Sequence, residues 1–149
     1  MKKLSLPVRF AVAISGSLIG YFLFLALFNY HTKPFFSLFN GVITGFGIFE
    51  AIKYHKLELR NEFSYTSGFT VGVTAGFLAT IFFTIFFLFY ATEVNPNFLE
   101  ELLTVFKREY NVGVGLVCFV VAIMGFASSV VLTLTFMQYF KISNNPGSK

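Results

Sequence analysis

Four long apolar stretches, separated by short polar segments, dominate the pattern of hydrophobic and polar positions along the chain. A helix that crosses the ~30 Å hydrocarbon core of a bilayer needs about 20 mostly apolar residues, and each stretch has roughly that length. The pattern therefore predicts an all-α fold, an integral membrane four-helix bundle. Its predicted spans are residues 10–28, 35–52, 68–90 and 112–140.

Small residues recur at every fourth position within the predicted spans, most regularly in the charge-free stretch 68–90. On a helix this spacing places them on one face, where they form a shallow groove that another helix can approach closely. We expect these residues to pack helices together, either inside the bundle or against a partner. They are Gly16 and Gly20 in the first span, Gly41 and Gly45 in the second, Gly68, Gly72, Gly76, Thr80 and Thr84 in the third, and Gly125 and Ser129 in the fourth.

The segment between the third and fourth spans has a different pattern. Asn95 is suited to the N-cap of a helix and Pro96 to its first position. Apolar residues then recur at helical spacing on one face, and charged residues occupy the other. This pattern predicts a short amphipathic helix at 96–110, which lies in the membrane interface or offers a docking face for a partner. A polar tail is expected at 141–149.

Composition agrees with a membrane protein. The chain of 149 residues is 56% hydrophobic and only 12% charged, whereas soluble domains are about 25% charged. The lipid bilayer is therefore the first expected partner, and the small-residue faces point to other membrane protein subunits or a second copy of the chain. The net charge of +4 is spread over the loops, so nucleic acid is not an expected partner.

The distribution of Lys and Arg predicts the orientation. Eight of the 11 basic residues fall on the side that holds both termini and the middle loop. Because basic residues are enriched in cytoplasmic loops, we expect both termini to be cytoplasmic. The eight are Lys2, Lys3, Arg9, Lys53, Lys56, Arg60, Lys141 and Lys149, and the other side holds Lys33, Lys107 and Arg108.

Few polar groups lie where they could carry chemistry. Glu50, near the end of the second span, is the only formal charge within the predicted spans. It would pair with Lys53 at the interface or face an inner vestibule. Asn40 would form an interhelical hydrogen bond or contact a solute. His31, in the turn between the first two spans, is expected to be solvated, the alternative being a pH sensor.

Catalytic and metal-binding motifs are missing from the sequence. It has no paired cysteines and no Asp, and both histidines lie outside the predicted spans. Cys118 lies inside an apolar run, where a small buried hydrophobic residue is expected. We therefore expect no catalytic residue, no metal, no cofactor and no enzymatic activity.

A set of short motifs carries a resemblance. They are Ile52-Lys53-Tyr54, Phe63-Ser64-Tyr65, Gly68-Phe69, Gly72, Tyr90, Asn95-Pro96 and Leu99. In these motifs the chain resembles the bacterial domain-of-unknown-function family 4199, whose members are small proteins with four predicted spans. The resemblance implies a four-span architecture in a bacterial inner membrane. Because the family has no established activity, it implies no functional site.

Two functions fit these observations. The abundant small-residue faces favour a small inner-membrane protein that acts through helix packing, as an accessory subunit of a membrane complex or as a homo-oligomer. The alternative is a carrier or channel for a small or lipid-like solute, suggested by Asn40, Glu50 and the row of Thr66, Thr70 and Thr74.

Overall fold

The computed structural model describes residues 5–105 and 113–140. Outside them, at 106–112 and 141–149, lie the end of the predicted amphipathic helix, the start of the predicted fourth span and the predicted tail.

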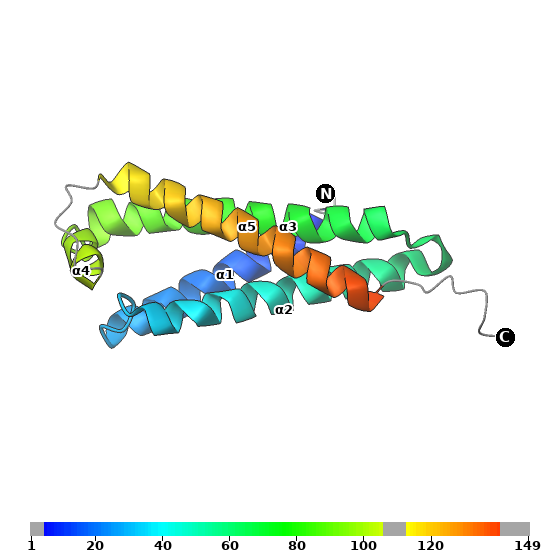
Figure 1. Ribbon diagram of the computed structural model, residues 1–149, viewed down its shortest axis with the longest axis horizontal. Coiled ribbons are helices and arrows are strands. Elements are labelled where there is room, and N and C mark those ends of the chain that lie inside the picture. The colour runs from blue at the N-terminus through cyan, green and yellow to red at the C-terminus, as the bar shows by residue number, and fades with distance from the viewer. Residues whose placement is uncertain (1–4, 106–112, 141–149) are drawn as a thin grey trace.

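Every regular element in the described part is helical, which confirms the all-α class. Four helices are long and apolar enough to cross a membrane, and the short α4 (Phe98–Val105) precedes the last of them (Figure 1). The long helices are α1 (Leu6–Leu27), α2 (Pro34–Leu59), α3 (Tyr65–Phe89) and α5 (Val114–Phe140).

Helix α3 is the centre of the bundle. It packs most extensively along α1 and α5 and also contacts α2. Helix α5 starts beside α3 at one end of the molecule and reaches α2 at the other (Figure 1). The largest buried cluster accordingly takes side chains from all four long helices. It includes Ile14 of α1, Ile48 and Ile52 of α2, Ala79 of α3 and Met137 of α5.

Asn29 ends α1 with a left-handed turn. Its φ of 56° is a conformation that Asn tolerates better than most residues other than glycine. The Asn29 N–H donates to the Ala26 carbonyl at 3.1 Å, and the Tyr30 N–H donates to the Leu25 carbonyl at 2.9 Å. This pair of bonds satisfies the last carbonyls of the helix. Pro34 then occupies the first turn of α2, so α1 and α2 are neighbours joined by a tight turn.

The connection between α2 and α3 lies outside the apolar runs. Helix α2 continues past the predicted end of its span, at Ile52, as far as Leu59. Helix α3 begins at Tyr65, just before the predicted third span, because a capping box precedes it. The Ser67 N–H donates to Ser64 Oγ and the Ser64 N–H donates to Ser67 Oγ, each at 3.2 Å.

The amphipathic helix begins later than its sequence pattern indicates. Helix α3 runs into one π-helical turn, Tyr90–Val94, which ends where the Asn95 N–H donates to the Tyr90 carbonyl at 2.9 Å. The Asn95 carbonyl then accepts from the Phe98 N–H at 3.0 Å. The chain therefore turns at Pro96, and α4 starts at Phe98.

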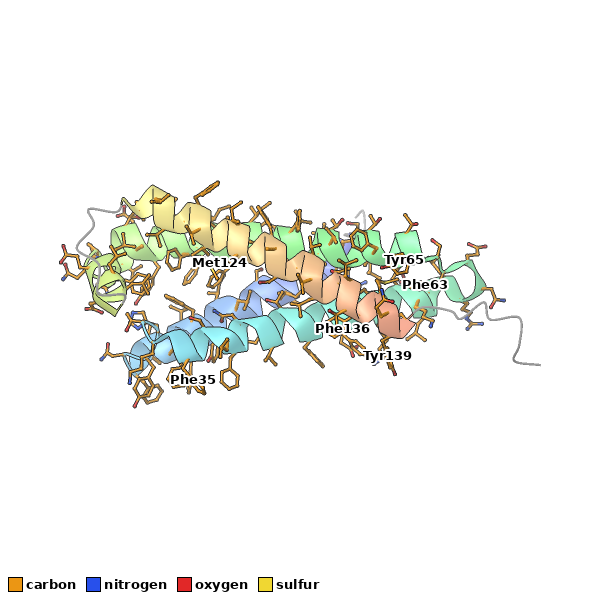
Figure 2. All side chains as sticks on the ribbon, in the orientation of Figure 1. Phe35, Phe63, Tyr65, Met124, Phe136 and Tyr139 are labelled. Carbon is orange, nitrogen blue, oxygen red and sulfur yellow. The ribbon has the colours of Figure 1, made fainter. Side chains whose placement is uncertain are left out.

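The outer surface of the bundle is apolar. Phe35, Met124 and Tyr139, labelled in Figure 2, have exposed fractions of 67%, 65% and 76%. Large exposed apolar side chains occur on all four long helices. A surface of this kind is stable when lipid tails cover it and is not typical of a soluble protein. The protein is therefore a multi-pass membrane protein.

Candidate functional site

The predicted groove on α3 is filled by α5. A Cβ atom added at Gly72 would lie 2.7 Å from Thr133 Cγ2, and one added at Gly76 would lie 2.5 Å from Ser129 Oγ. Neither glycine could therefore carry a side chain without moving α5. The three glycines Gly68, Gly72 and Gly76 are buried, as are Ser129 and Thr133. The occupant of the groove is thus the small-residue face of another helix of the same chain.

The contact is reciprocal further along the two helices. A Cβ atom at Gly125 of α5 would lie 2.5 Å from Thr80 Cγ2 of α3. Two hydroxyls along this contact bond to their own helices: Thr80 Oγ1 donates to the Gly76 carbonyl at 2.9 Å and Ser129 Oγ to the Gly125 carbonyl at 2.8 Å. The buried hydroxyl of Thr133 has no hydrogen-bond partner among the described residues. Thr84, the last residue of the row, is half-buried, and its hydroxyl has no hydrogen-bond partner among the described residues.

The small residues of α1 face outward. Gly16 and Gly20 are exposed, and a Cβ atom at either would meet nothing within 4 Å. Gly41 of α2 is equally open, whereas Gly45 is buried and its Cβ would lie 3.3 Å from Leu132 Cδ2 of α5. The predicted small-residue faces are therefore of two kinds. Those of α3 and α5 pack against each other, whereas that of α1 faces outward and meets no described residue within 4 Å.

One packing position on α2 was not predicted from the sequence. Gly47 receives the Ile14 side chain of α1, and a Cβ atom there would collide with it. Ala51, four residues on, is fully buried. The pair Gly47 and Ala51 has the same small-residue spacing as the predicted faces, so this spacing could have revealed the α1–α2 contact.

The two polar candidates of the second span lie apart and face different surroundings. The Glu50 carboxylate accepts from Lys53 Nζ at 3.0 Å in a partly exposed ion pair. Asn40 is half-buried, and its side-chain oxygen has no hydrogen-bond partner within the described part of the chain. A polar link between α1 and α2 comes from Tyr21, whose hydroxyl donates to the Phe36 carbonyl at 3.0 Å.

His31 is buried, and the expectation that it is solvated is wrong. Its exposed fraction is 8%, because α4 folds over the turn between α1 and α2. The imidazole stacks on Phe98 with ring centroids 5.0 Å apart and meets the edges of Phe22 and Tyr90 at 5.6 and 6.0 Å. Burial lowers the pKa of His31, and the carboxylate of Glu101 opposes that shift.

Aromatic rings hold α4 against the end of the bundle. Phe98 is almost fully buried, at 1% exposure. Phe22 lies at the middle of this cluster, where edge-to-face contacts of this kind are favourable. Cys118 is buried in the same cluster, as expected of a small hydrophobic residue. The rings within 6.2 Å of Phe22 are His31, Phe83, Phe86, Phe87, Tyr90 and Phe98.

Two recesses follow the line along which α2 meets α5. The first, of about 590 Å³, lies at the end of α2 and is lined by Lys53, Lys56, Leu57, Arg60, Asn61 and Phe140. The second has a similar volume and is an apolar groove beside the span, lined by Leu38, Gly41, Val42, Gly45, Phe46, Ser128, Val131, Leu132 and Phe136. Among the described residues no group of three His, Cys or Glu side chains is placed to hold a metal ion.

A family model matches residues 9–113, from α1 to the residue before α5. Its description is "Protein of unknown function (DUF4199)". The chain belongs to this family. Membership in the DUF4199 family confirms the resemblance carried by the sequence motifs, and it assigns no residue a role. No curated protein and no solved structure matches the chain.

The α3–α5 contact predicts a contrast between two glycine substitutions. Gly76→Ala places a methyl group against Ser129 Oγ and Cβ, so we expect a loss of about 1–3 kcal/mol of stability, as for other overpacked cores. Gly16→Ala adds the same methyl group at an open position and gains helix propensity of up to ~1 kcal/mol. Thermal unfolding in detergent measures both. Equal melting temperatures for the two variants would contradict the close packing of α5 against Gly76.

Burial of His31 predicts a pH dependence. Because its pKa is lower in the folded protein, the unfolded chain binds the proton first as pH falls, and stability decreases. The loss begins near the ordinary histidine pKa of about 6.5 and continues toward the lowered folded value. We expect the melting temperature to fall as the pH drops below about 7. His31→Phe, which retains a ring, should flatten this dependence, and His55→Phe at the other end should retain it.

Proposed function

We propose that this DUF4199 protein is a non-enzymatic bacterial inner-membrane protein that acts by packing the open face of α1 against another membrane segment. The observation that carries the proposal is the difference between the small-residue faces. Those of α3 and α5 are used inside the chain, whereas Gly16 and Gly20 meet nothing within 4 Å.

The face around Gly16 and Gly20 suits a close approach between helices. Ala13 and Ser17 are also exposed there, and Ser17 Oγ donates to the Ala13 carbonyl at 2.9 Å, so its polarity is satisfied within α1. In a bilayer, helix association depends on close packing rather than on the hydrophobic effect, because lipid tails are as apolar as the helices. Small residues supply that packing. The partner is a second copy of the chain or a span of another subunit.

The carrier or channel alternative has less support. Asn40 and Glu50 line neither of the two recesses between α2 and α5. Thr66 and Thr70 are exposed, and Thr70 Oγ1 donates to the Thr66 carbonyl at 2.8 Å, so these hydroxyls are not gathered around a path. Helix packing is therefore the function that the geometry supports best.

The α1 face predicts the outcome of an assembly experiment. The double variant Gly16→Leu/Gly20→Leu should lose the co-purifying subunit or fall to monomer mass in mild detergent, because the leucines hold the partner backbone away. Light scattering of the purified protein measures the mass. Ala127→Leu, at an exposed position on α5, is the matched control and should assemble normally. A wild-type protein that is monomeric without any partner, or a double variant that assembles unchanged, rejects the proposal.

The charge distribution predicts the topology. With both termini in the cytoplasm, a reporter active only outside the cytoplasm should be silent after Lys149 and active when inserted near Pro96. The same reporter inserted near Asn61 serves as a second cytoplasmic position and should be silent. The opposite pattern of activity would contradict this orientation.

A further inference from the structure

The basic recess at the end of α2 has an excess of hydrogen-bond donors. Lys53 shares its charge with Glu50 at 3.0 Å. Lys56 Nζ donates to the Phe140 carbonyl at 3.4 Å, which uses one of its three donors and offsets the negative end of α5. The Arg60 side chain forms no ion pair or hydrogen bond with any residue that the structure describes. The neighbouring carboxylates, Glu58 and Glu62, do not line the recess.

Arg60 occupies a position where glycine would be relaxed. Its φ of 48° lies in the left-handed region that side chains other than glycine rarely adopt. The chain reverses there between α2 and the short 3₁₀ turn Arg60–Glu62. A glycine would make this turn with less strain, and strained residues of this kind cluster at functional sites. The Arg60 guanidinium contributes positive charge to the recess.

The apolar groove lies further along the same two helices, and the Phe49 ring of α2 packs between it and the recess, with ring centroids 5.4 Å from Phe136 and 5.1 Å from Phe140. Phe140 lines the recess, and Phe136, one turn earlier on α5, lines the groove. Figure 1 shows this end of α5 beside α2, and Phe136 is labelled in Figure 2. At 1.5 Å per residue, Phe46 of the groove lies about 15 Å along the chain axis from Lys56 and about 21 Å from Arg60. Because one leaflet is ~15 Å deep, a lipid whose phosphate lies there reaches the groove with the distal part of a long acyl chain.

We propose that the α2–α5 seam is a binding site for one anionic phospholipid. Its phosphate lies against Lys56 and Arg60, with Lys53 at the edge, and one acyl chain lies in the apolar groove. A lipid is favoured because the two parts lie in line on the same two helices with the apolar Phe49 ring between them. The recess has the charge of a phosphate site, and a free phosphate would leave the apolar groove uncovered. This site is separate from the α1 face of the proposed function.

Native mass spectrometry of the full-length protein in detergent tests the site. With phosphatidylglycerol as the probe, we expect one bound lipid, and we expect phosphatidylcholine of the same chain length to bind more weakly. Arg60→Gln should lower phosphatidylglycerol binding about five-fold, the loss expected from one basic contact. Arg9→Gln removes the same charge from exposed α1 at the same end and should change binding little. Equal losses in the two variants, or equal binding of the two lipids, overturn the proposal.

Three further measurements distinguish lipid binding from misfolding and from the binding of free phosphate. Arg60→Gly relaxes the backbone and should lower lipid binding without lowering the melting temperature, which excludes misfolding as the cause. Val131→Phe fills the groove from α5 and should weaken the binding of long-chain but not of short-chain phosphatidylglycerol. Ile123→Phe, at an exposed position outside the groove, should change the binding of neither lipid. Inorganic phosphate in excess should not displace the lipid. If it does, the recess is a phosphate site only and the proposal fails.

Discussion

The structure depends on the close approach of α3 and α5. Gly72 and Gly76 let Thr133 and Ser129 reach the backbone of α3, at distances that any side chain on those glycines would prevent. In a bilayer this packing must supply the stabilisation that the hydrophobic effect supplies in water. The hydroxyls of Thr80 and Ser129 bond to their own helices and that of Thr133 has no partner among the described residues, so no described side-chain hydrogen bond joins the two helices. Once α5 lies in the groove, Met137 reaches the core beside α2.

The two ends of the bundle differ in chemistry. At one end aromatic rings surround Phe22, cover His31 and hold α4 through Phe98. Both ring nitrogens of His31 lack hydrogen-bond partners among the described residues, and such unsatisfied groups cost about 1–3 kcal/mol each. The aromatic packing must offset that cost. At the other end Lys56 and Arg60 leave donors directed to no described residue, so the first end is closed by contacts within the chain and the second is suited to an anion.

The two proposed roles belong to different surfaces of the bundle. The open face of α1, around Gly16 and Gly20, suits another helix because small residues let two helix backbones approach closely, and this packing stabilises helix association in lipid. The seam between α2 and α5 combines charge with an apolar groove and suits a single lipid. The two proposed sites share no residue, so we expect a variant at one surface to leave the other unchanged.

The sequence by itself determined the all-α class, the four spans and the family. These follow from local properties: a segment in lipid must satisfy its own backbone hydrogen bonds, so length and hydropathy suffice to predict a helix. Only the tertiary structure decided which small-residue faces are used, because the stripes of α1 and α3 look alike and differ only in whether α5 lies against them. The burial of His31 likewise requires Phe98, which is far along the chain and meets it only when α4 folds over the turn between α1 and α2.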